Sequence, residues 1–230
     1  MKKIIVTGAS KGIGYATSLS LAEKGHTVFA VARNEELLQQ LEKEASSKNI
    51  IPITADISNE TGIDFLIQKI HSVNGIDGLI NNAALLINKP FKELSIEDWK
   101  QHFELNVFSI IILIKSLLPS FNTRAHIVNI GSMAGYQGAQ KYASLSAYGA
   151  SKAALANLTE YLAIELKDYN ISVNCLSLGA VSTDMQKSAF PDFKSEISAE
   201  MMGNFIASFT IDNGILFNGK VIPVAVNNPN

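Results

Sequence analysis

The chain has 230 residues, 47% of them hydrophobic, and a net charge of -2 at pH 7. This length and apolar content suit one domain with a single core, and the balanced charge argues against nucleic acid or an anionic membrane as a partner. The single cysteine, Cys175, excludes an internal disulfide and a multi-cysteine metal site. We expect it to be a buried core thiol.

Two segments bear on the compartment. The N-terminal MKKIIVTGAS is too short in consecutive apolar residues for a secretory signal, which needs roughly 7–15. The most apolar segment, 106–121, is interrupted by Ser109, Lys115 and Ser116, and it falls short of the ~18 apolar residues of a membrane span. We therefore expect a cytoplasmic protein without a membrane partner.

Short apolar runs alternate with helical patterns along the chain. Strands are predicted at 3–8, 26–33, 49–57, 76–84, 125–132, 171–179 and 219–226. Helices are predicted between them at 12–25, 34–48, 58–75, 95–118 and 146–167. The helix over 95–118 opens with a capping pattern, Ser95-x-x-Asp98.

The predicted strands are continuous apolar runs, which is typical of strands buried on both faces of a parallel sheet. Regular alternation with helices then predicts an α/β fold, a Rossmann-type doubly wound parallel sheet of about seven strands with helices on both faces. No linker or repeat divides the chain, so we expect one domain over 1–230. In such sheets ligands bind beyond the carboxyl ends of the strands.

A glycine-rich stretch, TGASKGIG, follows the first predicted strand. Gly8, Gly12 and Gly14 allow a tight turn and close approach of the backbone to a ligand. The helix that follows presents unpaired N–H groups and the positive end of its dipole, which suits a pyrophosphate. The alternative is an ordinary strand-to-helix turn.

The end of the second strand bears on which dinucleotide is bound. An NAD site usually has an acidic residue there, whereas an Arg accommodates the 2′-phosphate of NADP. This strand ends in Arg33, and Lys11 in the glycine loop adds a second cation. We therefore favour NADP(H), with NAD(H) possible. The alternative is that both cations are merely solvated.

Tyr148 and Lys152 are four residues apart on a predicted helix, so both lie on one face. A free phenol has a pKa of about 10. We expect the nearby ammonium to favour the phenolate, so that Tyr148 exchanges a proton with a carbonyl or an alcohol. A Tyr-x-x-x-Lys spacing also arises by chance, so the pair gains meaning only from its surroundings.

Several motifs occur in a fixed order: TGASKGIG, Asp56 after the third strand, NNAA at 81–84, Asn106, Ser132 and YGASK at 148–152. In these motifs the chain resembles the short-chain dehydrogenase/reductase family, in its single-domain form with TGxxxGxG and YxxxK. The resemblance runs from Lys3 to about Thr183.

The resemblance implies a catalytic group of Asn106, Ser132, Tyr148 and Lys152. In that family the Ser orients the substrate oxygen, the Tyr exchanges the proton, the Lys also holds the cofactor ribose, and the Asn holds a water. The cofactor-binding residues implied by the motifs and the resemblance are Gly8, Ser10, Lys11, Gly12, Ile13, Gly14, Arg33, Asp56, Ile57, Asn82, Ala83, Tyr148, Lys152, Gly179, Val181 and Thr183. Asp56 and Ile57 would contact the adenine.

The chain departs from the family pattern in three places. Leu178-Gly179 stands where the family often has Pro-Gly, which we expect to loosen the loop. The stretch from Ser132 to Tyr148 is slightly longer than expected. Residues 136–145 are therefore a candidate substrate-facing loop that would bring Gln140, Lys141 and Tyr142 near the mouth of the site. The substrate-covering segment, about 184–209, begins with a short lid, and the usual Asp-Gly-Gly near the end is missing.

The leading hypothesis is an NADP(H)-dependent oxidoreductase that interconverts a carbonyl and an alcohol. One rival is a non-catalytic NADP-binding sensor or scaffold; another is an epimerase or dehydratase of the family's extended branch. The substrate stays open among a 3-oxoacyl thioester, a sugar, a steroid and a small aldehyde. The resemblance also implies a homodimer or homotetramer through the helices at about 95–118 and 147–167.

Four histidines, His26, His71, His102 and His126, have no spacing typical of metal ligands. We expect them on the surface or in loops, and we predict no metal. Trp99 and Phe103, four residues apart, are expected to form a packing face of their helix.

Overall fold

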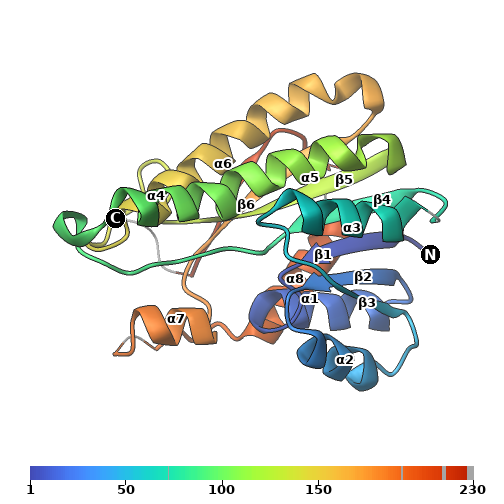
Figure 1. The fold of residues 1–230 in the computed structure, drawn as a ribbon, viewed down its shortest axis with the longest axis horizontal. Coiled ribbons are helices and arrows are strands. Elements are labelled where there is room, and N and C mark those ends of the chain that lie inside the picture. The colour runs from blue at the N-terminus through green and yellow to red at the C-terminus, as the bar shows by residue number, and fades with distance from the viewer. Residues whose placement is uncertain (72, 193, 214–215, 227–230) are drawn as a thin grey trace.

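Seven parallel strands form one sheet in the computed structural model of the chain, which describes residues 1–71, 73–192, 194–213 and 216–226 (Figure 1). Their spatial order is β3-β2-β1-β4-β5-β6-β7. The strands are β1 (Lys3–Thr7), β2 (Thr27–Ala32), β3 (Ile50–Thr54), β4 (Ile76–Asn81), β5 (Phe121–Ser132), β6 (Ser172–Leu178) and β7 (Val221–Val224). The predicted doubly wound sheet is confirmed, and the order reverses between β1 and β4.

Helices cover both faces of this sheet (Figure 1). They are α1 (Gly12–Glu23), α2 (Glu35–Glu44), α3 (Glu60–His71), α4 (Ile96–Phe103), α5 (Ser109–Leu117), α6 (Ser146–Glu165), α7 (Asp184–Ala189) and α8 (Ala199–Ser208). Neighbouring strand residues face opposite layers: Ile5 packs into the cluster with α3, α5 and α6, whereas Ile4 packs with α1, α2 and α8. This two-sided burial explains why the strands read as continuous apolar runs.

The helix expected over 95–118 is divided in two. A π-helical turn, Glu104–Phe108, separates α4 from α5. Within it, the side chain of Asn106 bonds to both the N–H and the C=O of Leu85, and such turns are frequent at functional sites. The stretch Ile96–Ser120 is long and apolar enough to cross a membrane by length and composition, contrary to the expectation that this segment falls short. In the folded chain 39% of its most apolar window is buried, and Leu113 and Leu117 lie in the core.

Two of the four histidines are buried, so the expectation that all lie on the surface or in loops was wrong. His126 donates from Nδ1 to the carbonyl of Thr210 at 3.1 Å, and Asn174 donates to its Nε2 at 3.0 Å. His102 has partners on both ring nitrogens as well. A buried imidazole with one donor and one acceptor satisfied is stable in the neutral form, which explains how these rings enter the core. Cys175 is buried, as expected.

Candidate active site

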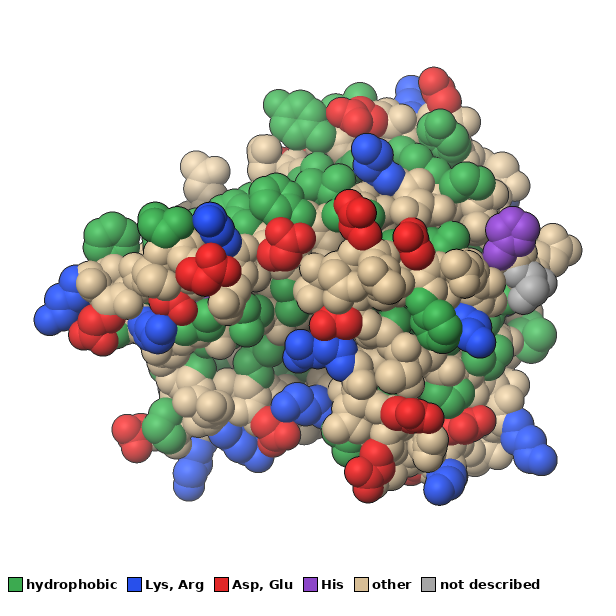
Figure 2. Space-filling view, viewed as in Figure 1, with side chains coloured by type: hydrophobic (Ala, Val, Ile, Leu, Met, Phe, Trp, Pro, Cys, Tyr) green, Lys and Arg blue, Asp and Glu red, His purple; other side chains and the backbone are tan. Residues whose placement is uncertain are grey.

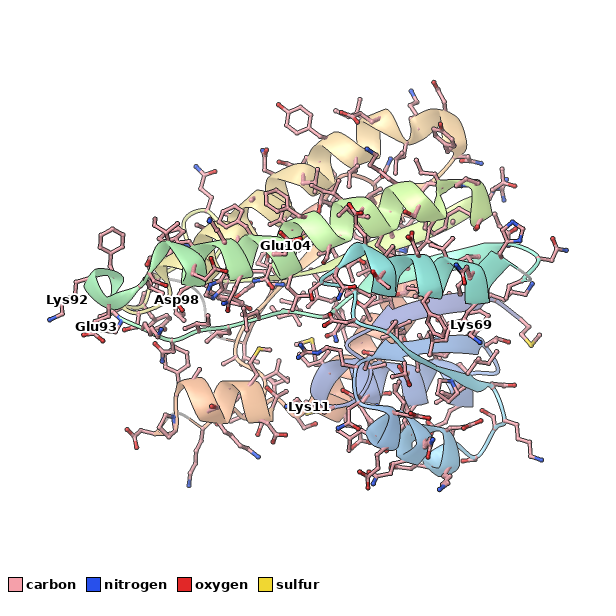
Figure 3. All side chains as sticks on the ribbon, in the orientation of Figure 1. Lys11, Lys69, Lys92, Glu93, Asp98 and Glu104 are labelled. Atoms are coloured by element: carbon pink, nitrogen blue, oxygen red, sulfur yellow. The ribbon has the colours of Figure 1, made fainter. Side chains whose placement is uncertain are left out.

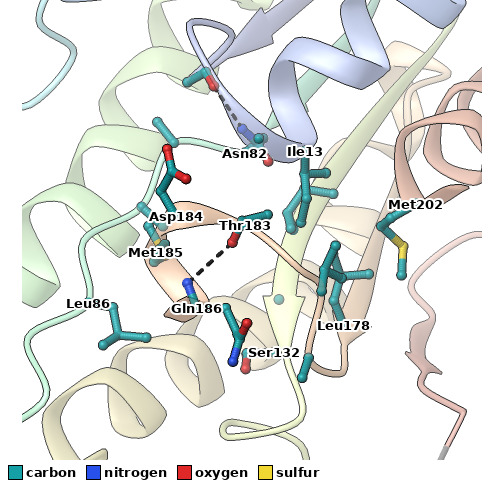
Figure 4. Close-up of a pocket in the computed structure, with 18 of the residues that line it drawn as sticks. Ile13, Asn82, Leu86, Ser132, Leu178, Thr183, Asp184, Met185, Gln186 and Met202 are labelled. Atoms are coloured by element: carbon teal, nitrogen blue, oxygen red, sulfur yellow. Dashed lines mark hydrogen bonds between the residues drawn. The ribbon is translucent and has the colours of Figure 1, made fainter. Parts of the chain in front are cut away.

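A cavity of about 1280 Å³ opens at the carboxyl ends of the strands (Figure 4). Its lining includes most of the residues predicted for the site: Gly8, Ser10, Lys11, Gly12, Ile13, Arg33, Asp56, Ile57, Asn82, Ala83, Ser132, Tyr148, Lys152, Gly179, Val181 and Thr183. Gly14 and Asn106 are not part of that lining. Segments far apart in the sequence thus meet at one edge of the sheet, because parallel strands end there together.

The glycine loop connects β1 to α1 at the centre of the sheet. Gly8 and Gly12 have φ angles of +66° and +59°, in the left-handed region that favours glycine. Asn82, at the end of β4, donates from its side-chain amide to the carbonyl oxygens of Thr7 and Gly8 at 2.9 and 3.2 Å. This pair of bonds holds the loop in place from the neighbouring strand.

The start of α1 suits an anion. In the described structure its cap residue, Lys11, makes no side-chain capping bond, and its first turn carries no acidic side chain. Gly12 and Ile13 at this end line the cavity, and the positive end of the helix dipole favours negative charge there. Figure 3 shows Lys11 projecting from this end of α1. These residues fit the pyrophosphate of a dinucleotide.

Gly14 lies behind the loop rather than on the cavity. A Cβ at this position would approach the carbonyl oxygen of Gly8 to 2.4 Å and the amide nitrogen of Asn82 to 2.5 Å. Gly14 is therefore needed for close packing of α1 against the loop and β4. The predicted contact of Gly14 with the cofactor stays a prediction, and the structure adds this packing role.

Arg33 and Asp56 come together where β2 and β3 end. The guanidinium and the carboxylate are 3.9 Å apart, and the Arg33 side chain is 75% exposed. The other carboxylate oxygen of Asp56 accepts bonds from the N–H and the hydroxyl of Ser58. Asp56 is thereby fixed at the cavity, while the arginine fork keeps donors available for an incoming phosphate.

Ser132, Tyr148 and Lys152 meet where β5 ends and α6 begins. Ser132 lies close enough to the Tyr148 hydroxyl to affect its pKa. The ammonium of Lys152 lies 5.9 Å from the centre of the Tyr148 ring, and its exposed fraction is 2%. The Ser132 hydroxyl also accepts a bond from the N–H of Ala134 at 3.1 Å, which orients it. The predicted pairing of Tyr148 and Lys152 on one helix face is present.

The pKa values of this pair depart from their usual range because of burial. Burial raises the pKa of Tyr148, and the nearby Ser132 side chain opposes that rise. Burial also lowers the pKa of Lys152 to about 8, and proximity to Cys175 opposes that change. The direction of the Tyr148 shift is opposite to the expectation that the ammonium makes the phenol more acidic, because loss of solvent is the largest cause of the shift.

Asn106 is fully buried, and its side-chain bonds go to other protein groups. Its oxygen accepts from the N–H of Leu85 at 2.8 Å, and its nitrogen donates to the carbonyl of Leu85 and to Ser151, both at 3.0 Å. The amide has thereby used both of its donor hydrogens. The side chain of Asn106 therefore positions the backbone around Leu85. If Asn106 holds a water, as predicted, its backbone would have to bind that water.

Two of the three residues that were expected from the loop 136–145 line the cavity. Gln140 and Tyr142 line the cavity. Lys141 instead turns back, and its ammonium donates to the carbonyls of Met133, Ala134 and Tyr136 at 3.5, 3.0 and 2.6 Å. Lys141 thus braces the turn that follows Ser132 and is not among the lining residues.

The substrate-covering segment has two parts. Thr183 caps α7, and its hydroxyl accepts a bond from the N–H of Gln186 at 3.3 Å (Figure 4). In the second part, α8 packs against α1, where a Cβ on Gly203 would come within 2.7 Å of Ala16. The lid therefore consists of α7 and the described residues between α7 and α8.

Several lining residues were not predicted. They are mostly apolar and include Val31, Ala55, Leu86, Leu105, Met133, Met185 and Phe190. Their residue types carry no chemical signal in the sequence. Only their positions shortly after strands or within the covering segment offered a clue.

The fold and this edge of the sheet define a Rossmann-type nucleotide-binding protein. The family model for short chain dehydrogenases matches residues 2–194. The chain belongs to that family of oxidoreductases, as the sequence motifs predicted.

Relatives and solved structures agree with this assignment. The chain is 35% identical to an L-xylulose reductase of Caenorhabditis elegans, with 97% of this chain and 94% of the relative covered. It is 33% identical to an NADPH-dependent pterin aldehyde reductase of Arabidopsis thaliana, covering 93% and 91%. A short chain dehydrogenase from Burkholderia cenocepacia in complex with NADP superimposes with a TM-score of 0.87 at 26% identity, covering 97% and 96%.

Proposed function

We propose that this oxidoreductase reduces a carbonyl compound to an alcohol with NADPH, and that Tyr148 supplies the proton. The observation that carries the proposal is the position of the Tyr148 side chain near Ser132 and the buried ammonium of Lys152, all three on the wall of the cavity. When bound, the nicotinamide would supply the hydride.

Ser132 and Tyr148 would hold the carbonyl oxygen together. Because burial raises the pKa of Tyr148, its hydroxyl keeps its proton at neutral pH, the form that an acid needs. As negative charge develops on the substrate oxygen, both hydroxyls stabilise it, in the manner of an oxyanion hole. Lys152 would then stabilise the phenolate that remains. This favours the direction of reduction.

The preference for NADP(H) over NAD(H) has support at two places. Arg33 and Lys11 offer cations where β2 ends and α1 begins, at the position expected for the 2′-phosphate. One relative is named as NADPH-dependent, and a similar solved structure holds NADP. Gly8, Gly12 and Ile13 would hold the pyrophosphate, Asp56 and Ile57 the adenine, and Val181 and Thr183 the nicotinamide end.

The rival hypothesis, a redox sensor without catalysis, needs the glycine loop but not the proton donor. Tyr148→Phe separates the two. We expect turnover of carbonyl substrates with NADPH to fall by about 10²–10⁴-fold, because general acid catalysis contributes that much. The dissociation constant of NADPH, measured by fluorescence titration, should change by less than about threefold, because the ring is retained. Tyr169→Phe, on an exposed tyrosine after α6, is the control. Equal turnover in Tyr148→Phe and the wild type would refute the proposal.

We also propose that the chain forms a homodimer or homotetramer through α4, α5 and α6. Hydrophobic side chains gather on the surface over these helices (Figure 2). Among them, Phe108 is 48% exposed, Tyr161 59% and Ile164 74%. Apolar side chains clustered on helix faces are typical of subunit interfaces.

A further inference from the structure

The segment from Ala84 to Lys89 passes between α4 and the cavity without regular secondary structure. Its residues alternate in what they contact. Leu85, Ile87 and Lys89 bond to side chains of α4 and of the π-helical turn after it. Ala84 and Leu86 line the cavity. Leu85 and Ile87 make these bonds with their backbone N–H groups, and Lys89 makes its bond with its ammonium. Such alternation is the geometry of an extended chain, in which successive backbone N–H groups, like successive side chains, point to opposite sides.

Three polar side chains hold the outer side of the segment. Asn106 bonds to both backbone groups of Leu85, at 2.8 and 3.0 Å. His102 accepts from the N–H of Ile87 at 3.1 Å. Asp98 accepts two bonds of 3.1 Å from the ammonium of Lys89, and Figure 3 shows Asp98 on α4 above the passing segment. We call these three residues the ladder.

The ladder works because two spacings match. Residues 98 and 102 are four apart on α4, which places them about 6 Å apart along one face, and Asn106 follows four residues later in the π-helical turn. Alternate residues of an extended chain are about 6.6 Å apart. One helix face can therefore hold every second residue of the segment in a fixed register.

His102 is the middle member, and it is fully buried. Its Nδ1 donates to the carbonyl oxygen of Asp98 at 2.7 Å, which fixes the ring and leaves Nε2 as the acceptor for Ile87. The ring also lies edge-on to the ring of Tyr148, with the centroids 6.4 Å apart. One residue thus contacts both the segment and the proton donor.

The opposite side of the segment meets the site. Leu86 lies at the same end of the cavity as Ser132 and Gln186 (Figure 4). Two residues on, the side chain of Asn88 donates to the carbonyl of Ala189 at the end of α7. The segment is therefore at once a wall of the substrate end and an anchor for the lid.

We propose that His102 is a positioning residue that fixes this wall, and that Leu86 on the wall determines which carbonyl substrates fit. The inference deepens the proposed reductase function and rests on it for its kinetic part. The ladder itself is a property of the folded chain and is tested separately.

Hydrogen exchange followed by mass spectrometry tests the ladder without turnover. In His102→Leu we expect the amides of 85–89 to exchange at least about tenfold faster, because the N–H of Ile87 loses its acceptor. In His102→Gln the side-chain oxygen can accept the same bond, so exchange should stay within about threefold of the wild type. Unchanged exchange at 85–89 in a folded His102→Leu would overturn the ladder. If His102→Leu does not fold, His102→Gln is compared with the wild type, and loss of protection there overturns it.

Kinetics with benzaldehyde and the bulkier benzil, each with NADPH, test the role of Leu86. We expect Leu86→Ala to shift the ratio of kcat/KM values towards benzil by at least about fivefold, with the dissociation constant of NADPH unchanged. His102→Leu should raise KM for both carbonyls more than it lowers kcat, and His102→Gln should restore KM. An unchanged ratio in Leu86→Ala would overturn its part in specificity. A wild type that reduces no carbonyl would refute the proposed function, while the exchange experiment would still decide the ladder.

Discussion

The ammonium of Lys152 donates a hydrogen bond of 2.7 Å to the carbonyl oxygen of Ile130, two residues before Ser132 on β5. This bond ties α6, which carries Tyr148, to the strand that carries Ser132. The same burial that makes the bond possible lowers the pKa of Lys152 to about 8. The charge of this lysine therefore changes within a pH range that an enzyme experiences.

We predict that kcat/KM for carbonyl reduction falls as the pH rises through about 8. Below that value Lys152 is charged and stabilises the phenolate left by proton transfer; above it the charge is lost. The pH dependence of kcat/KM with NADPH checks this. Lys152→Arg keeps its charge at higher pH, so any residual activity should lack this fall. A profile that is flat from pH 7 to pH 10 would contradict the assignment.

Arg33→Ala should weaken the use of NADPH. A charge-assisted hydrogen bond contributes about 1.5–3 kcal/mol, so KM for NADPH should rise about 10- to 100-fold, with KM for NADH within about twofold. Steady-state kinetics with both cofactors measure the difference. Lys43→Ala, on the exposed side of α2, is the control for general loss of positive charge. An equal rise in KM for NADPH and for NADH would show that Arg33 does not bind the 2′-phosphate.

Gly14→Ala should destabilise the fold more than a typical surface change. The new methyl group would lie 2.4 Å from the carbonyl oxygen of Gly8, and Asn82 cannot withdraw because it bonds to Thr7 and Gly8. We expect the free energy of unfolding in urea to fall by at least about 2 kcal/mol. At Gly25, with φ +82° and open space around it, the same change should lower it by about 1 kcal/mol. A smaller loss at Gly14 than at Gly25 would contradict the packing role.

Acid should destabilise the protein through His126. Burial lowers its folded-state pKa to about 4 from an ordinary value of 6.5, so between these two pH values the unfolded chain binds more protons. The free energy of unfolding should therefore fall by up to about 3 kcal/mol as the pH drops from about 6.5 to 4. His126→Gln should have a shallower fall over that range, measured by urea unfolding at several pH values. If the free energy of unfolding depends on pH in the same way in the wild type and in His126→Gln, His126 is not the group responsible for the acid destabilisation.

Charge placed on the α5 and α6 surface should separate the subunits. We expect Phe108→Glu with Ile164→Glu to be monomeric by light scattering at micromolar concentration, because both side chains are exposed in the single chain. Met201→Glu, on α8 across the sheet, should leave the oligomer intact. A wild type that is itself monomeric at that concentration would refute the proposed interface.

Much of the site could be predicted from sequence because its chemistry depends on local features. Gly8 and Gly12 need backbone conformations that glycine adopts, and Tyr148 and Lys152 share a face because one helix turn separates them. The apolar strands likewise predicted the parallel sheet. Each of these signals lies within a few residues, or within one repeated pattern of strand and helix.

Other features depend on neighbours that are distant in the sequence. The pKa of Tyr148 rises because surrounding elements remove solvent, which the four-residue spacing to Lys152 did not reveal. The burial of His102 depends on Ile87 crossing α4, and the role of Gly14 depends on Asn82 from another strand.

The sequence alone determined the parallel α/β fold, the glycine loop and the pairing of the tyrosine with the lysine, since local geometry specifies all three. Only the tertiary structure decided which polar groups lose contact with water, and which side chains face the cavity rather than support it. Desolvation and hydrogen-bond partnership arise from the packing of separate segments, so no short stretch of sequence contains them.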